Sequence, residues 1–274
     1  SLIRRDPDVD TVWTLEHLLK DNDDVRAYLQ LPDEIFEETI DIEKLKLQDK
    51  KIGDHGILMI DTEDPVCAVA SLFSMEDFTI FAMTEQKLMH ELLKKTAKYI
   101  HKRTQIVSEQ YPDNLWRIYG PEYITEPYLP PKFFDEYVVT YTAPMVKMIQ
   151  SNGGFARIHA HGNMKNILDY IVKMGADAID PVEPPPQGDI ELDEIMKNYG
   201  DKLVVFGNIE ISDLENSPPE TFKEIVKKTL VESQKYEHRG FVLMPSAAPY
   251  GRQISDTTFI NYQIMINMVK DFQL

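Results

Sequence analysis

The stretch FARIHAHG at residues 155–162 is a short apolar run that ends in a glycine, and the amphipathic stretch NMKNILDYIVKMG at 163–175 follows it directly. The first stretch has the small and β-branched residues of a buried strand. The second has helical spacing, and its closing Gly175 is typical of a helix C-cap. A strand followed at once by a helix is one βα unit, and this unit predicts the rest of the fold.

The same alternation recurs along the chain from residue 56. Short apolar runs predict strands at 56–60, 115–120, 155–162, 177–183, 202–210 and 240–246. Helical segments follow at 64–73, 84–110, 130–153, 163–175, 192–200, 217–236 and 256–272. Six βα units with nearly continuous apolar strands indicate an α/β fold with a parallel sheet covered by helices.

The choice within this fold class lies between an open doubly wound sheet and a barrel. No G-x-G-x-x-G or G-x-x-x-x-G-K-[ST] motif occurs, so the usual nucleotide sites of the open folds are excluded and no nucleotide cofactor is expected. Polar residues gather where the predicted strands end, which is typical of a TIM (β/α)₈-type barrel. The sequence therefore predicts such a barrel, incomplete because about six units are visible.

The first 52 residues are predicted to be a helical lead-in to a single domain that covers residues 1–274. Val12, Leu15, Leu18 and Leu19 have helical spacing, and a second helix is expected to start at Asn22 and to stop before Pro32. A barrel with six visible units lacks its first two strands. The gap would be closed by a longer natural chain, by dimerisation or by these helices. We favour the longer chain, with a homodimer as a compatible arrangement.

The charge of the chain argues against two classes of partner. Lys and Arg number 29 against 46 Asp and Glu, which gives a formal net charge of -17. Such a surface repels nucleic acids and anionic lipids. The single cysteine, Cys67, excludes an internal disulfide, and no apolar run approaches the roughly 20 residues of a membrane helix. We expect a soluble, cytoplasmic protein that acts on a small molecule.

His159 and His161 are the first candidate site residues. Side chains two apart in a strand point the same way, so both imidazoles could bind one zinc ion. Glu183, which ends the next predicted strand, could be the third ligand or a general base. The alternative is that both histidines are ordinary polar residues at a strand end and that Glu183 lies exposed in a loop, and the sequence leaves this open.

Other polar residues occupy matching positions after neighbouring strands. Glu122 and Asn208 are candidate catalytic residues, although any one glutamate in so acidic a chain is more often solvent-facing, and Glu210 could cap the turn that follows it. The candidate substrate-binding residues are Tyr123, Ser246, Tyr250 and Arg252. The loop that holds the last three could equally be a stiff connection.

With these residues in view, the chain resembles the uroporphyrinogen decarboxylase superfamily from about residue 53 onward. YGPEYITEPYLPPKFFDEYVVTYTAPMV at 119–146 is similar to a family stretch in which an acidic residue ends a strand. ARIHAHGN at 156–163 is similar to the family's H-x-C-G segment, and VVFGNIE at 204–210 resembles its QGNLDP segment. The resemblance implies a (β/α)₈ barrel and either decarboxylation or corrinoid-dependent methyl transfer.

Departures from the family patterns decide between these activities. The arginine-rich loop and the aspartate by which the decarboxylases hold their substrate are missing, which makes this lyase activity the weaker choice. The methyltransferases hold zinc with cysteines, but His161 and Ser246 stand at those places, so Glu183 or Glu122 would have to aid His159 and His161. The resulting N/O site suits polarising an oxygen better than activating a thiol, which favours an ether- or amine-type methyl donor or a carboxylate substrate.

The resemblance therefore implies metal-assisted methyl transfer that involves a corrinoid on a partner protein. The first alternative is a cofactor-free decarboxylase of a porphyrinogen or another carboxylate, with Arg252 or Arg157 holding the acid. The second alternative is a non-catalytic member that binds a ligand or a partner.

Overall fold

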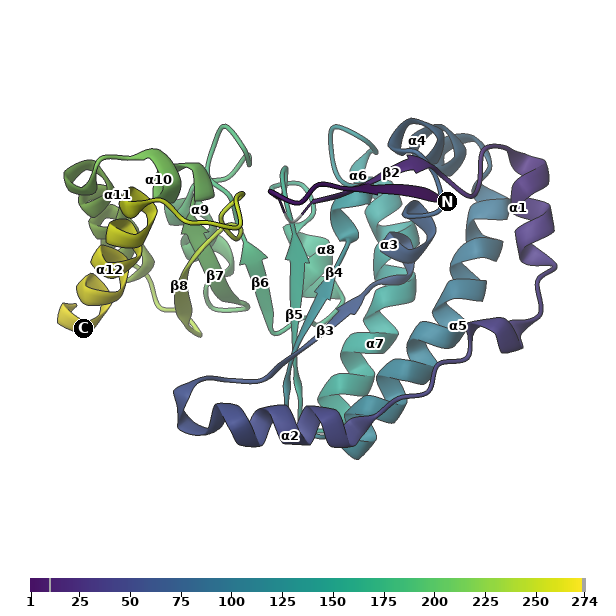
Figure 1. Cartoon of the computed structure of the whole chain (residues 1–274), viewed down its shortest axis with the longest axis horizontal. Helices are drawn as coiled ribbons and strands as arrows, with labels where there is room; N and C mark the ends of the chain where they lie inside the picture. Colours follow the sequence, from purple (N-terminus) through teal and green to yellow (C-terminus); the bar gives the residue numbers. More distant parts are fainter. Residues whose placement is uncertain (10, 273–274) are drawn as a thin grey trace. The chain divides into compact units, whose positions relative to one another are not determined.

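The computed structural model describes residues 1–9 and 11–272, which fall into two compact units (Figure 1). Unit 1 comprises Glu16–His159 and Asp169–Asp177 together with Ser1. Unit 2 comprises Leu2–Leu15, Ala160–Leu168 and the chain from Ala178. The single domain expected from the sequence stays a prediction.

Three parallel strands in chain order form the sheet of unit 1: β3 (Met59–Glu63), β4 (Leu115–Tyr119) and β5 (Phe155–Ala160), the last residue of which is assigned to unit 2. The long helices are α4 (Met75–Thr84), α5 (Gln86–Gln110) and α7 (Thr140–Ser151). The remaining helical elements are α1 (Asn22–Leu29), η1 (Asp33–Phe36), α2 (Ile42–Ile52), η2 (Gly53–His55), α3 (Pro65–Ala70), η3 (Pro121–Ile124), α6 (Pro131–Phe133), η4 (Phe134–Val139) and α8 (Leu168–Lys173).

Alternation along the strands explains how this sheet is buried. Trp116 pairs with Ala156 and Ile118 pairs with Ile158, and all four side chains are buried on one face. Helix α5 covers the core with buried residues at helical spacing, among them Met89, Leu92, Leu93, Thr96, Ala97 and Ile100. It runs beside α7 in Figure 1, which closes the apolar layer of unit 1.

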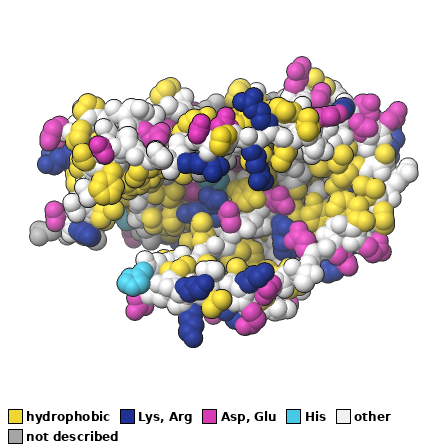
Figure 2. Space-filling view, in the orientation of Figure 1, with side chains coloured by type: hydrophobic (Ala, Val, Ile, Leu, Met, Phe, Trp, Pro, Cys, Tyr) yellow, Lys and Arg dark blue, Asp and Glu magenta, His cyan; other side chains and the backbone are white. Residues whose placement is uncertain are grey.

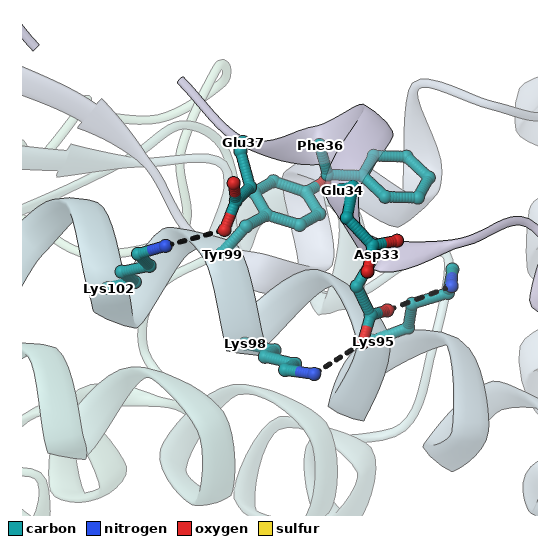
Figure 3. A pocket seen from close by; sticks show the side chains of 8 residues that line it. All are labelled: Asp33, Glu34, Phe36, Glu37, Lys95, Lys98, Tyr99 and Lys102. Carbon is teal, nitrogen blue, oxygen red and sulfur yellow. Dashed lines mark hydrogen bonds and ion pairs between the residues drawn. The ribbon is translucent and has the colours of Figure 1, made fainter. Parts of the chain in front are cut away.

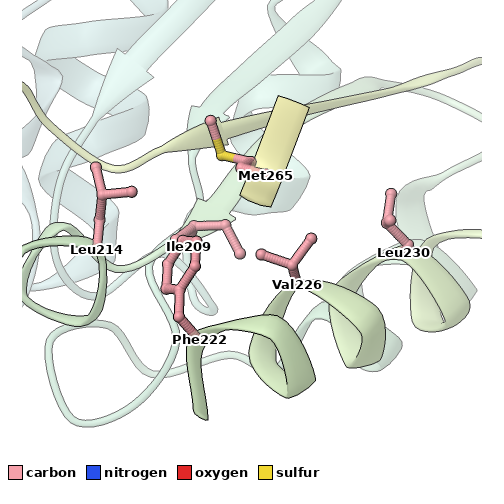
Figure 4. Close-up of a cluster of buried hydrophobic side chains, with 6 residues drawn as sticks. All are labelled: Ile209, Leu214, Phe222, Val226, Leu230 and Met265. Carbon is pink, nitrogen blue, oxygen red and sulfur yellow. The ribbon is translucent and has the colours of Figure 1, made fainter. Parts of the chain in front are cut away.

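Unit 2 contains the parallel strands β6 (Ala178–Pro181), β7 (Val204–Ile209) and β8 (Phe241–Pro245), again in chain order. Its helices are α9 (Leu192–Tyr199), α10 (Ile211–Asn216), α11 (Pro219–Ser233) and α12 (Asp256–Asp271). Figure 4 shows the cluster that joins β7 to α10, α11 and α12, made of Ile209, Leu214, Phe222, Val226, Leu230 and Met265. Each such large buried side chain contributes about 1.5–3 kcal/mol.

The helix predicted from Val12 to Leu19 is wrong. Residues Val12–Glu16 form strand β2, which pairs with β1 (Leu2–Arg5) in a two-stranded sheet. Val, Trp and Thr favour extended backbone, and a local strand partner outweighs the helical spacing of the leucines. The second predicted helix is confirmed as α1, and α2 falls within the predicted helical lead-in but was not predicted as a separate helix.

The six predicted βα units are confirmed, and so is the α/β fold class. The largest shift is in β3, which occupies 59–63 where the sequence predicted 56–60. No helix among residues 1–9 and 11–272 is both long and apolar enough to cross a bilayer. Figure 2 shows acidic and basic side chains interspersed with hydrophobic ones on one face.

Candidate active site

The carboxyl ends of the parallel strands carry polar side chains in both units. Because parallel strands end at the same edge of a sheet, the side chains that follow them converge within each unit. They are Asp64, Glu122 and His159 in unit 1, and His161, Glu183, Glu210 and Ser246 in unit 2.

His161 and Glu183 form a hydrogen-bonded pair in unit 2. Nδ1 of His161 lies 2.9 Å from Oε1 of Glu183, and the backbone N–H of Gly162 donates to Oε2 at 2.8 Å. The Glu183 side chain is only 11% exposed, whereas the His161 side chain is 37% exposed. Both carboxylate oxygens therefore hold the loop that carries His161, and Glu183 fixes the orientation of the imidazole.

The loop after β6 is anchored so that Glu183 stays in this position. A Cβ at Gly188 would lie 2.0 Å from the carbonyl oxygen of Glu183, so only glycine lets the chain fold back this closely. One residue later, Oδ1 of Asp189 accepts the backbone N–H groups of Met164 at 2.7 Å and Lys165 at 3.0 Å. The loops that follow β5 and β6 are thus tied together on both sides of the pair.

Glu210 and Ser246 form a second pair in unit 2. The buried Ser246 hydroxyl donates to Oε2 of Glu210 at 3.3 Å and accepts the backbone N–H of Ile211 at 3.0 Å. Burial and the carboxylate of Glu183 raise the pKa of Glu210, and the Ser246 hydroxyl partly offsets this increase. Ser246 thus holds a carboxyl group at the start of α10, and Glu210 occupies the N-cap position that the sequence suggested.

The remaining predicted residues of unit 2 lie in different surroundings. Asn208 is buried in β7, next to Gly207, where a Cβ would lie 2.2 Å from the carbonyl oxygen of Pro181. Tyr250 is exposed, and its backbone N–H donates to Oε1 of Glu215 at 3.1 Å. Nε and Nη2 of Arg252 donate to the carbonyl oxygen of Val9 at 3.3 and 3.2 Å. This guanidinium therefore fastens the segment Leu2–Leu15 to the loop after β8.

Asp64 follows strand β3 in unit 1. Its side chain is fully buried at the N-terminus of α3, where Oδ1 accepts the backbone N–H of Cys67 at 2.7 Å. Oδ2 accepts the hydroxyl of Thr142 at 3.2 Å. Burial raises the pKa of Asp64 to about 8, with a smaller contribution from the carboxylate of Glu122. The pKa of the Cys67 thiol is also raised, chiefly by burial.

Glu122 and Tyr123 lie in η3, just after a tightly packed glycine. A Cβ at Gly120 would come within 2.1 Å of Cys67 Cβ and 3.1 Å of Asp64 Oδ1. The corner formed by Gly120 and η3 therefore packs directly on α3. The ring of Tyr123 meets that of Phe78 edge-on, with 6.3 Å between the centroids. Burial raises the pKa of Tyr123. These contacts fix the backbone that presents Glu122.

The polar residues within β4 and β5 are held by contacts inside unit 1. His159 pairs with Tyr119 in the register of β4 and β5. Arg157 is buried, and its Nη2 lies 3.1 Å from Sδ of Met59. On β4, Arg117 makes a bidentate ion pair with Asp61 at 2.6 and 2.8 Å. The arginines of this sheet are therefore engaged with the protein itself.

A model of the uroporphyrinogen decarboxylase (URO-D) family matches residues 14–272. The chain belongs to the uroporphyrinogen decarboxylase family. This assignment agrees with the resemblance inferred from the sequence.

A solved methyltransferase from Methanosarcina mazei is similar to this uroporphyrinogen decarboxylase family member. The two share 18% sequence identity with a TM-score of 0.67, over 84% of this chain and 63% of that chain. This chain thus spans less than two thirds of the length of the methyltransferase. The likeness supports an incomplete barrel-type α/β fold. No curated protein matches the chain.

A metal in this family member would have His161 as a ligand. A histidine that binds a metal usually donates its other ring N–H to a carboxylate, and the His161–Glu183 pair has this arrangement. His161 fits a metal, whereas Glu183 fits better behind the histidine than on the ion. Within the part of the chain that the structure describes, no three or more His, Cys, Asp or Glu side chains are grouped to hold an ion.

Asp64 was not predicted from the sequence. It precedes Pro65, so it reads as an ordinary helix N-cap, which it also is. Its position after the first predicted strand is nevertheless the one that singled out Glu122 and Glu183. The same rule would have identified Asp64, but its burial without a cation could not be foreseen.

A separate pocket of about 200 Å³ lies in unit 1 between η1 and α5 (Figure 3). Lys95 and Lys98 both pair with Asp33, and Lys102 pairs with Glu37 at 2.8 Å. The ring of Phe36 stacks on Tyr99. The charges along this pocket therefore neutralise one another and fasten η1 to α5.

Proposed function

We propose that this chain transfers a methyl group between a small-molecule donor and a corrinoid carried by a partner protein. The observation that carries the proposal is the His161–Glu183 pair at the carboxyl ends of β5 and β6. Membership of the family and the likeness to a protein named as a methyltransferase support it. The donor class that suits this site has an ether- or amine-type methyl group.

The residues of the chain would contribute position and charge. Glu183, itself held by the N–H of Gly162, keeps His161 in one tautomer with the proton on Nδ1 and the lone pair on Nε2. His161, with His159 as the second nitrogen expected from the sequence, would hold a divalent ion such as Zn²⁺. When bound, the ion supplies Lewis acidity towards the heteroatom that leaves the methyl group.

Decarboxylation is the weaker alternative because the arginines are engaged elsewhere. A carboxylate substrate needs converging cations, yet the Arg252 guanidinium donates to a backbone carbonyl and Arg157 contacts Met59. The net charge of -17 also disfavours a highly anionic porphyrinogen. A neutral or cationic methyl donor meets neither obstacle.

Elemental analysis of the purified chain tests the metal. We expect stoichiometric zinc in the native chain, its loss in His161→Ala, and its retention in His55→Ala, which changes an exposed histidine in η2. A native chain without zinc, or an unchanged zinc content in His161→Ala, would remove the metal from the proposal.

Incubation of cob(I)alamin with a methyl ether or a methylamine tests the reaction. We expect methylation of the corrinoid that depends on His161 and no turnover of a porphyrinogen. Turnover of the porphyrinogen without methylation would instead establish the decarboxylase alternative. Each assay is run on both histidine variants, so that loss of activity can be separated from loss of fold.

A further inference from the structure

Asp64 is a buried carboxyl group that the proposed function does not use. It is 0% exposed, and its side chain bonds a backbone N–H and a hydroxyl but no Lys, Arg or His among residues 1–9 and 11–272. An ionised carboxylate in such surroundings pays a large desolvation cost that two neutral donors do not offset. Burial therefore favours the neutral acid, in agreement with its raised pKa of about 8.

Its two hydrogen bonds indicate which oxygen carries the proton. The backbone N–H of Cys67 can only donate, so Oδ1 must remain an acceptor. The hydroxyl of Thr142 can accept as well as donate, so a proton on Oδ2 has an acceptor at 3.2 Å. Once the Thr142 hydroxyl hydrogen turns away from Oδ2, the neutral acid satisfies both oxygens without moving any heavy atom.

The titratable groups that face Asp64 are acidic or neutral. They are Glu63 at the end of β3, Cys67 on α3, and Glu122 on η3. Tyr123 on η3 is also within electrostatic reach of Asp64. A negative charge on Asp64 would therefore repel the carboxylate of Glu122. Gly120, which packs against Cys67 and Asp64, directly precedes the η3 segment that carries Glu122.

We infer that Asp64 carries a proton on Oδ2 and, as a neutral acid, is a positioning residue that holds the corner formed by Gly120 and η3 against α3. Ionisation of Asp64 drives Glu122 and Tyr123 out of place. The inference rests on the proposed function only in assuming that Glu122 and Tyr123 serve the reaction. The proton on Asp64 and the packing of η3 against α3 are properties of unit 1 alone.

Infrared spectroscopy of the full chain tests the proton. The spectrum at pH 7 should contain a protonated-carboxyl band that disappears above pH 8 and is absent from Asp64→Asn. In Thr142→Val, which lacks the hydroxyl, the band should persist to higher pH, whereas Thr142→Ser should behave as the native chain. Absence of the band from the native chain at pH 7 would overturn the inference.

Methyl NMR tests the positioning role. The methyl signals of Ile124, fully buried in η3, should shift with a midpoint near pH 8 in the native chain and stay constant in Asp64→Asn. Signals that do not move while the infrared band titrates would show that the proton has no positioning role. Neither readout requires methyl transfer, so a failure of the proposed function leaves this test intact. Where transfer is measured, its rate should fall above pH 8 in the native chain only.

Discussion

Glu183 in unit 2 and Asp64 in unit 1 are both carboxyl groups that follow a parallel strand, yet their surroundings differ. Glu183 accepts from a histidine ring and a backbone N–H and retains 11% exposure. Asp64 is fully buried with two neutral donors. The comparison shows that the end of a strand in a repeated βα unit can place a carboxyl group against a histidine or bury it completely beside two neutral donors.

The largest expected effect concerns the pH dependence of stability. Asp64 has an ordinary pKa of 3.8 and a folded-state pKa of about 8, so the folded chain binds the proton more tightly. Its contribution to stability is therefore present below about pH 4 and is lost as the pH rises through 8. The loss is on the order of 5 kcal/mol. Urea unfolding at several pH values should show this decline in the native chain and not in Asp64→Asn.

Equal pH slopes for the native chain and Asp64→Asn would break the comparison, because Asp64 would then be as easily ionised as a solvated carboxylate. Asparagine is the matched change, since its oxygen can accept from Cys67 and its amide can donate to Thr142.

A pair of glycines sharpens the comparison next. Gly120 and Gly162 both have positive φ, but a Cβ at Gly120 meets Cys67 at 2.1 Å whereas a Cβ at Gly162 has no atom within 4 Å. We expect Gly120→Ala to lower the free energy of unfolding by about 3 kcal/mol or more, and Gly162→Ala by only about 1–2 kcal/mol. Similar losses measured by chemical denaturation would mean that the corner in unit 1 can relax.

A smaller effect is expected from the Ser246 hydroxyl. Ser246→Ala removes the hydroxyl that accepts the backbone N–H of Ile211, which also bonds to Glu210, and should cost about 1 kcal/mol. It should also raise the pKa of Glu210 further, because the hydroxyl lowers it. Ser151→Ala, which removes an exposed hydroxyl that bonds Lys147 O, is the control. NMR titration of the carboxyl groups measures the pKa of Glu210. An unchanged pKa of Glu210 in Ser246→Ala would contradict the pairing of Ser246 with Glu210.

Much of the fold could be predicted because each strand is a short apolar run followed by an amphipathic helix. The exception is instructive: Val12, Leu15, Leu18 and Leu19 do have helical spacing, but β1 supplies a strand partner. A pairing between segments is not visible in the period of either segment.

For the candidate site, the sequence could predict which residues lie close together but not the role of each. The rule that residues after parallel strands converge placed His161 and Glu183 together. The rule could not distinguish a carboxylate that binds an ion from one that orients a histidine. That distinction depends on which N–H groups donate hydrogen bonds to the two carboxylate oxygens. Nor could the rule identify Arg252 as a structural contact, because Val9 is distant in the sequence.

The affinity of Glu183→Gln for zinc is the most direct test of the account. Loss of the carboxylate should weaken zinc binding about 10- to 100-fold, because His161 would no longer be held in one tautomer. The free energy of unfolding without metal should fall only by the contribution of one hydrogen bond, about 1 kcal/mol. Zinc affinity equal to that of the native chain would contradict the claim that Glu183 presents His161 to a metal.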